Sequence, residues 1–278
     1  MRLSISNIAW DVNEDEEVAA LLQSYGVDAI DIAPSKYFTN PFYATDKEIY
    51  SVKNWWLARG IEITGMQALL FGTNGLNIFS SQEIQNAMLN HLSAVCRIAK
   101  GLGATRLVFG SPKNRDCSGY SEQQAIKIAT SFFCQLGDIA QDNGVVMCLE
   151  PNPICYGANF MTSSPEAAYI VREVGHPSIK MQLDIGSLAI NNENIGSIVQ
   201  EYSSIIGHVH ASEPDLVPLG DGKSDHYEAA SVMNRYLTKH LVSIEMAATK
   251  NESHKTSIER SLCIAIKYYR NSNFLACS

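Results

Sequence analysis

The chain has 278 residues, of which 46% are hydrophobic and 18% are charged. This length suits one or two domains, or a single α/β barrel of about 250 residues. The formal net charge is −8, from 21 Lys and Arg against 29 Asp and Glu. Such a charge argues against a nucleic-acid-binding protein, which normally carries a basic face. The seven cysteines are scattered without a CxxC pair, so we expect neither a disulfide framework nor a cysteine zinc site.

The N-terminal residues 1–7 carry no long apolar run and no cleavage-type signal. No stretch of the chain approaches the roughly 18 apolar residues that a membrane span needs. We therefore expect a soluble, cytoplasmic protein with neither a membrane nor a nucleic acid as partner. The sequence leaves open whether the chain forms a homo-oligomer.

Eight short runs rich in β-branched residues recur along the chain, and each is followed by a segment with helical spacing. The runs cover residues 3–8, 29–33, 62–70, 106–109, 145–150, 179–184, 207–211 and 241–246. The clearest helical segment is 81–102, where apolar residues recur every three or four positions. Gly103 follows directly and is predicted to end the helix. The last segment repeats this spacing through Ile258, Leu262, Ile266 and Tyr269.

Alternating strands and helices predict a parallel sheet with helical crossovers, and at this length a closed (β/α)8 TIM barrel of the α/β class is the economical solution. A doubly wound open sheet is the alternative. It is disfavoured because residues 6–11, after the first strand, contain no glycine for a phosphate-binding loop. Since no linker or change of composition divides the chain, we expect residues 1–278 to form a single domain, with 214–226 as a long loop.

Each of the last four predicted strands ends in a potential metal ligand. These residues are Glu150, Asp184, His210 and Glu245, which lie 34, 26 and 35 residues apart. Each interval is about one strand–helix unit, and the carboxyl ends of the strands are where barrel enzymes place their chemistry. The four side chains are therefore expected to converge at one end of the barrel.

The residues two positions before these four candidates are also polar or small, namely Cys148, Gln182, His208 and Ser243. Residues two apart share a face of a strand, so four neighbouring strands would carry a polar stripe into the barrel. Taken singly, an aspartate before glycine is commonly a helix cap, and a strand histidine is commonly a core residue. Burying polar side chains on four strands costs folding free energy unless they find bonding partners. A bound cation would be such a partner, so the stripe favours a metal site.

Three carboxylates and one imidazole suit a hard divalent ion. Oxygen-rich sites with one nitrogen favour Mn²⁺, with Mg²⁺ or Co²⁺ as alternatives, over a closed zinc site. Six coordination would leave about two positions for adjacent substrate oxygens.

The segments around these residues resemble a known family. They read Leu-Glu-Pro, Gln-Leu-Asp-Ile-Gly, Gly-His-Val-His and Ser-Ile-Glu-Met, and they resemble the xylose-isomerase-like barrels of the sugar phosphate isomerase/epimerase family, in particular its D-tagatose 3-epimerase-like branch. The resemblance spans nearly the whole chain, although its specific motifs lie in the second half. It implies a divalent metal, often Mn²⁺, held by Glu150, Asp184, His210 and Glu245, with both glutamates as the proton-transfer pair.

Three positions depart from the pattern of that branch. Ser187, Tyr156 and Leu216 stand where its members usually carry histidine, glutamate and arginine. These positions contact the substrate in relatives, so the resemblance predicts the metal site better than the substrate.

Together these features predict a metal-dependent isomerase or epimerase of a ketose, a sugar phosphate or a related small hydroxy-carbonyl compound. Glu150 and Glu245 would move the proton through an enediolate. One alternative is a metal-dependent dehydratase of an inosose or a dehydroshikimate-like acid. Another is a metal-binding barrel without turnover. A nuclease of a related branch would need histidines on early strands, whereas the first histidine here is His91.

Five further residues are candidates for substrate binding. Lys113 and Arg115, in the loop after the fourth strand, would hold a phosphate or a carboxylate, unless that loop is simply solvated. Trp10 would stack on a sugar face, with a core position as the alternative. Gln67 would bond a substrate hydroxyl, and His208 lies one inward step before the predicted ligand His210.

Overall fold

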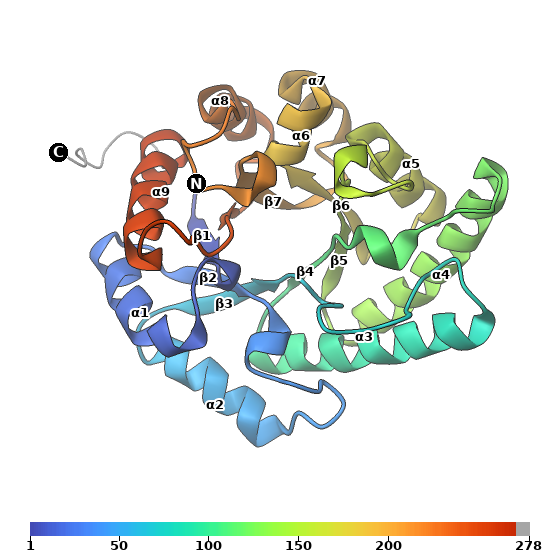
Figure 1. Cartoon of the computed structure of the whole chain (residues 1–278), viewed down its shortest axis with the longest axis horizontal. Helices are drawn as coiled ribbons and strands as arrows, with labels where there is room; N and C mark the ends of the chain where they lie inside the picture. The colour runs from blue at the N-terminus through green and yellow to red at the C-terminus, as the bar shows by residue number, and fades with distance from the viewer. Residues whose placement is uncertain (271–278) are drawn as a thin grey trace.

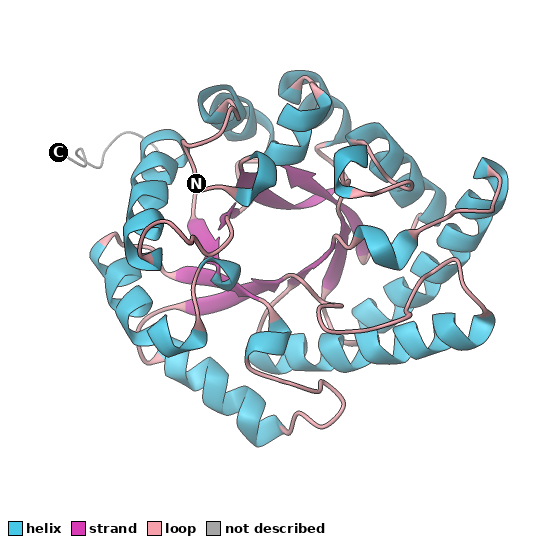
Figure 2. Cartoon of the chain, viewed as in Figure 1, coloured by secondary structure: helices cyan, strands magenta, loops and turns pink. Residues whose placement is uncertain are grey.

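A computed structural model describes residues 1–270. Within these residues eight parallel strands close into a barrel in the order β1 to β8, and helices surround it on the outside (Figures 1 and 2). Parallel pairing of β1 with β8, which sets Leu3 beside Val242, closes the ring. The predicted (β/α)8 TIM barrel is thus confirmed.

The strands agree closely with the predicted runs. They are β1 Leu3–Ser6, β2 Ala29–Ile32, β3 Glu62–Met66, β4 Arg106–Phe109, β5 Val146–Leu149, β6 Ile179–Asp184, β7 Ile206–Ser212 and β8 Val242–Glu245. The main difference is β3, which was predicted to reach residue 70. It ends at Met66 because Ala68 takes a left-handed backbone conformation, with φ of 53°, and this turns the chain away from the sheet.

The outer layer consists of α-helices, with 3₁₀ turns in the loops. The α-helices are α1 Asp15–Ser24, α2 Asp46–Leu57, α3 Gln82–Leu102, α4 Glu122–Asp142, α5 Ser164–Val174, α6 Ile185–Asn191, α7 Ile195–Tyr202, α8 His226–Tyr236 and α9 His254–Tyr269. The 3₁₀ turns are η1 Asn7–Ala9, η2 Val12–Glu14, η3 Pro34–Lys36, η4 Pro112–Arg115, η5 Ile154–Tyr156 and η6 Pro214–Leu216. Two helices, α6 and α7, follow β6, where the alternating pattern predicted one.

The hydrophobic core lies between the sheet and the helices. The predicted apolar stripe of α3 buries Met88, Leu92 and Val95, and Gly103 ends the helix with a positive φ of 89°, as its freedom from a side chain allows. On the neighbouring unit, Phe109 of β4 packs edge-on against Phe133 of α4, with ring centroids 5.3 Å apart. This packing holds the strand ends, and hence the site they carry, in a rigid frame.

Within residues 1–270, no helix combines the length and the apolarity that crossing a bilayer would require.

Candidate metal centre and cavity

The four predicted ligands come together at one end of the barrel. Glu150 follows β5, Asp184 ends β6, His210 lies in β7 and Glu245 ends β8. Each offers a ligand atom, and these atoms all lie within 4.8 Å of one another. Strand register explains the meeting, because Asp184 pairs with His210 on the neighbouring strand, while Ser212 pairs with Glu245. All four residues are buried.

The imidazole of His210 lies at the centre of the cluster. Its Nδ1 atom is 3.2 Å from Glu150 Oε1, 3.1 Å from Glu245 Oε2 and 3.9 Å from Asp184 Oδ2. Neither ring nitrogen of His210 has a hydrogen-bond partner, and neither does Glu150 Oε1. Buried polar atoms without partners are costly. A shared cation would satisfy them, and this donor set fits Mn²⁺, Mg²⁺ or Co²⁺.

Crowding of like charges shifts the acidity of the cluster. Burial, together with the nearby carboxylates of Glu245 and Glu150, raises the pKa of Asp184 to about 7. Burial alone would lower the pKa of His210, but the same two carboxylates outweigh it and raise that pKa well above its usual value. A divalent cation would relieve the repulsion among these acids. The shifted pKa values and the set of ligand atoms therefore both favour a divalent cation at this site.

Surrounding groups orient two of the candidate ligands. Asp184 accepts the backbone N–H of Ser187 at 2.6 Å, as the N-cap of α6, and the hydroxyl of Ser212 at 2.7 Å. Glu245 accepts a hydrogen bond from Gln67 Nε2 at 2.7 Å. Such contacts fix the direction of metal ligands. The sequence reading missed Ser212, although its place two residues beyond His210 on the same strand face could have indicated it.

Glu150 is held by a separate group of residues. Asn152 donates to Glu150 Oε2 at 3.2 Å, and Arg115 Nη1 donates to the Glu150 carbonyl at 2.7 Å. A second guanidinium nitrogen, Arg115 Nη2, donates to Asn152 Oδ1. Gly110 leaves room for the carboxylate, since a Cβ atom there would lie 2.0 Å from Glu150 Oε2. Asn152 and Gly110 were not anticipated from the sequence.

Arg115 corrects one of the substrate-binding predictions. Its side chain is fully buried behind Glu150 and it does not line the cavity. Burial lowers the pKa of Arg115 to about 10, so the group remains charged at neutral pH. The η4 turn directs Arg115 inward, where the Glu150 carbonyl and the Asn152 side-chain oxygen accept from its two Nη atoms.

Trp10 is a second correction. Its side chain is fully buried, its indole N–H donates to Asp15 Oδ1 at 2.8 Å, and its ring packs edge-on against Trp56. The η1 turn after β1 sends this residue into the core, where Asp15 satisfies its polar atom. Trp10 does not line the cavity, so it is not placed to stack on a sugar.

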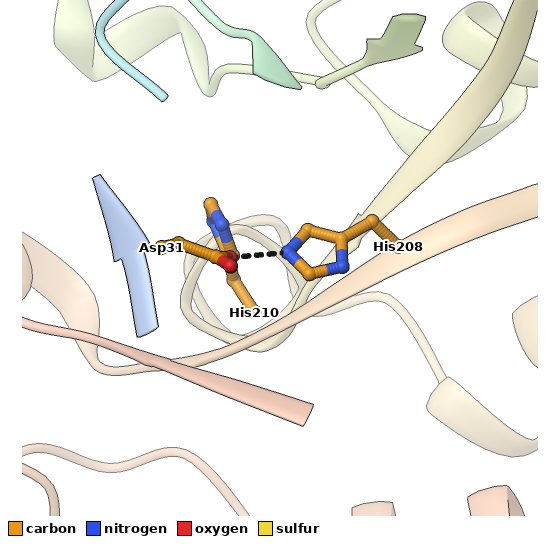
Figure 3. Close-up of side chains that lie close together, drawn as sticks. All are labelled: Asp31, His208 and His210. Atoms are coloured by element: carbon orange, nitrogen blue, oxygen red, sulfur yellow. Dashed lines mark hydrogen bonds and ion pairs between the residues drawn. The ribbon is translucent and has the colours of Figure 1, made fainter. Parts of the chain in front are cut away.

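His208 lies in the barrel interior and outside the cavity lining, which corrects its prediction as a substrate contact. Its Nε2 atom is 2.7 Å from Asp31 Oδ2, and Figure 3 shows the ring pointing at this carboxylate with His210 alongside. Burial alone would raise the pKa of Asp31, but His208 outweighs it and lowers that pKa. Asp31, in β2, went unnoticed because its partner is 177 residues away.

A cavity of about 380 Å³ is lined by three of the four candidate ligands. Gln67 and Lys113, two of the predicted substrate-binding residues, line it together with Glu150, Asp184 and Glu245. Lys113 is exposed on the rim. The cavity is large enough for a small molecule and has charged groups at one end.

Two curated proteins are similar to parts of this chain. A human protein provisionally named hydroxypyruvate isomerase is 26% identical over 169 residues, which cover 56% of this chain and 61% of that protein. A D-psicose 3-epimerase from Agrobacterium fabrum is 24% identical over 93 residues, which cover 34% of this chain and 32% of that protein. The chain therefore spans about three fifths or less of the length of these curated relatives.

Solved structures match over almost the whole chain. The D-psicose 3-epimerase from Clostridium cellulolyticum H10, crystallised with D-tagatose, superposes with a TM-score of 0.79 at 18% identity, covering 97% of this chain and 98% of that one. A D-psicose 3-epimerase crystallised with D-fructose gives a TM-score of 0.80 at 15% identity, covering 97% and 99%. These likenesses show a shared fold. The profile of the family described as xylose isomerase-like TIM barrel matches residues 19–263, and the chain belongs to that family.

Proposed function

We propose that this protein is a divalent-metal-dependent isomerase or epimerase of a small hydroxy-carbonyl compound, such as a ketose or a sugar phosphate. The observation that carries the proposal is the buried cluster of Glu150, Asp184, His210 and Glu245, in which His210 faces three carboxylates without a hydrogen bond. Relatives named hydroxypyruvate isomerase and D-psicose 3-epimerase support it. Mn²⁺ is the expected ion, with Mg²⁺ or Co²⁺ as alternatives.

These four residues would hold the ion. When bound, a divalent cation supplies Lewis-acid polarisation of a carbonyl oxygen and its neighbouring hydroxyl. The protein's part is to place proton acceptors beside the carbon that bears this hydroxyl. Glu150 and Glu245 come from strands three apart in the ring, and each has an oxygen within 3.2 Å of His210 Nδ1. They approach the same centre from different strands, which allows them to flank a substrate.

The proton transfer needs no oxidant or reductant. One glutamate accepts the proton from the hydroxyl-bearing carbon, and the electron pair of the broken C–H bond becomes part of the enediolate double bond. A proton returned to the opposite face of the same carbon gives the epimer, whereas a proton returned to the neighbouring carbon gives the isomer. Gln67 orients Glu245, while Asn152 and the backbone contact of Arg115 orient Glu150.

Replacement of each glutamate tests this proposal. Incubation of the Mn²⁺-loaded protein in deuterated water with a panel of ketoses and sugar phosphates should exchange a carbon-bound proton of the substrate. Glu150→Gln and Glu245→Gln should each slow that exchange by about 10²–10⁴-fold, the usual contribution of one acid–base group. Glu173→Gln on the exposed face of α5 is the matched control and should leave the rate unchanged. Exchange that persists in both site variants would contradict the proposal.

A further inference from the structure

The cavity wall contains few polar side chains that make no hydrogen bond inside the protein. Outside the four candidate ligands, most polar side chains that line the cavity already bond within the protein. Ser111 donates to Asn114, Ser187 donates to the Pro151 carbonyl, Asn152 bonds Glu150 and Arg115, and Glu213 accepts from the backbone N–H groups of Gly220 and Ser224. These contacts use the hydroxyl hydrogens of Ser111 and Ser187 and restrain Asn152 and Glu213, so each offers a substrate fewer hydrogen bonds than a free side chain would.

Two polar groups of the wall, Gln67 Oε1 and the Lys113 ammonium, make no hydrogen bond with any residue in 1–270. Gln67 Oε1 is buried without any hydrogen-bond partner, while its amide nitrogen is committed to Glu245. This oxygen accepts only, so it calls for a donor such as a substrate hydroxyl next to Glu245. On the rim, Lys113 lines the cavity and makes no hydrogen bond or ion pair with any residue in 1–270. Its ammonium group calls for an anion.

Much of the remaining wall is apolar. It includes Ile8, Leu69, Leu70, Val108 and Leu216. Tyr156 adds its ring, and its hydroxyl accepts the backbone N–H of Asp215 at 2.7 Å. A long polyhydroxylated chain would press hydroxyl groups against these carbon surfaces without partners, which is unfavourable.

Leu216 is held in this wall by a constrained backbone. Both Asp215 and Leu216 have positive φ, of 60° and 53°, which is costly for residues with side chains. Hydrogen bonds fix the turn, from Leu216 N–H to the Glu213 carbonyl at 3.0 Å and from Ala247 N–H to the Leu216 carbonyl at 2.8 Å. Such strain at a cavity wall points to a role in shaping the site rather than to chance packing.

We propose that the substrate is a short anionic hydroxy-carbonyl compound whose carboxylate or phosphate binds Lys113. Its carbonyl and neighbouring hydroxyl lie at the four candidate ligands, one hydroxyl donates to Gln67 Oε1, and few other hydroxyl groups are present. This inference rests on the proposed function, which it narrows to one class of substrate. Lys113 favours such an anion over a neutral ketose, and the apolar wall favours a short compound over a long sugar chain.

Four probe compounds separate charge from length. Dihydroxyacetone, hydroxypyruvate and dihydroxyacetone phosphate share three carbons and differ in the distal group, whereas D-fructose is neutral with six carbons. Deuterium exchange by the Mn²⁺-loaded protein gives kcat/KM for each, and calorimetry gives the binding constant independently of turnover. We expect kcat/KM for hydroxypyruvate or dihydroxyacetone phosphate to exceed that for dihydroxyacetone and D-fructose at least about ten-fold. The better of the two anions identifies carboxylate or phosphate as the preferred group.

Lys113→Gln makes the test specific to the proposed contact. It should raise KM and the dissociation constant for the anionic probes about ten-fold or more, with a clearly smaller effect on dihydroxyacetone. Lys239→Gln removes an exposed lysine in the loop before β8, at the opposite end of the barrel, and should change none of these values.

The outcomes separate this inference from the proposed function. Exchange that favours D-fructose or dihydroxyacetone would overturn the anionic substrate and leave the proposed function standing. Anion binding that depends on Lys113 would support the anion site, and the absence of exchange with these probes and with the whole panel of ketoses and sugar phosphates would then contradict the proposed function. Equal anion binding by wild type and Lys113→Gln would overturn the inference whatever the exchange rates are.

Discussion

At the scale of single residues, Arg115 is a positively charged group placed behind a carboxylate rather than in front of a ligand. Its guanidinium bonds the Glu150 carbonyl and Asn152, and Asn152 bonds the Glu150 carboxylate. Arg115 is therefore a positioning residue in the proposed reaction. It fixes the backbone and the side chain of Glu150 together, within a region of negative charge that favours the burial of a cation.

Loss of this support should impair catalysis more than substrate binding. Arg115→Met and, with a smaller disturbance, Asn152→Ala should each lower kcat at least about ten-fold with little change in KM, because Glu150 loses its alignment. Steady-state exchange kinetics and melting curves would measure this. Arg106→Met is the matched control, because it removes an arginine that bonds the carbonyls of Gly207 and Thr105. A kcat that falls equally in all three variants would indicate general destabilisation.

Gly110 provides a steric test of the same carboxylate. Gly110→Ala would put a methyl group 2.0 Å from Glu150 Oε2, so the carboxylate must move. We expect weaker Mn²⁺ binding and an exchange rate reduced at least about ten-fold, as follows from displacing a catalytic group by about 1 Å. Titration of Mn²⁺ and the exchange assay would measure both effects. Unchanged Mn²⁺ affinity would show that Glu150 does not depend on this space.

Residue types predicted the cluster but not the direction of every side chain. Glu150, Asp184, His210 and Glu245 could be found because each lies in the last residues of a strand or directly after it, where alternation decides which way a side chain points. Trp10 and Arg115 lie in short 3₁₀ turns or just after them. In such turns side chains do not alternate as they do in a strand. The direction of each side chain depends instead on partners far away in the sequence, which the sequence pattern does not reveal.

At the scale of elements, the loop between β7 and α8 folds around a single carboxylate. Glu213 accepts the backbone N–H groups of Gly220 and Ser224 and lies 3.2 Å from His226 Nε2, and His226 in turn contacts the Tyr269 hydroxyl. Burial alone would raise the pKa of Glu213, but these hydrogen bonds outweigh it and lower the pKa to about 2. The loop that carries Leu216 thus depends on an ionised Glu213.

This low pKa predicts how stability changes in acid. A carboxyl group with a folded-state pKa near 2 and an ordinary value near 4.5 contributes its stabilisation fully above about pH 4.5. That contribution falls away as the pH drops toward 2, by about 3 kcal/mol in all. Glu213→Gln should lose much of this dependence in denaturant unfolding between pH 3 and 7. The exposed control Glu122→Gln should retain the wild-type slope, and an unaltered slope in Glu213→Gln would contradict this account.

The strands were more predictable than the connections between them. The predicted runs 106–109 and 179–184 coincide with β4 and β6, because apolar residues recur at every second position on the face that packs against the helices. The end of β3 was placed too late, since the left-handed turn at Ala68 uses a residue type that gives no warning of it. The division of the segment after β6 into two helices likewise depends on caps at Asp184 and Asn194, which resemble ordinary loop residues.

At the scale of the whole molecule, one ion would join the ends of four strands. Since β5 to β8 each contribute one candidate ligand, binding to the folded state should stabilise half of the barrel at once. Saturation at about 100 times the dissociation constant contributes about 2.7 kcal/mol, or roughly 5–10 °C in melting temperature for a domain of this size. Scanning calorimetry of chelator-treated protein with and without Mn²⁺ would measure the shift. His210→Ala, at the same Mn²⁺ concentration, should reduce the shift by about half or more, whereas a shift of the same size in that variant would place the stabilising ion elsewhere.

Direct titration of Mn²⁺ followed by electron paramagnetic resonance examines the shared ligation of one ion by the four strand-end residues. Chelator-treated wild-type protein should bind one Mn²⁺ per chain, and Glu150→Gln, Asp184→Asn, His210→Ala and Glu245→Gln should each weaken that binding about ten-fold or more while the chain remains folded. Wild-type affinity in all four variants, or the absence of binding in the wild type, would contradict the metal centre on which the proposed chemistry depends.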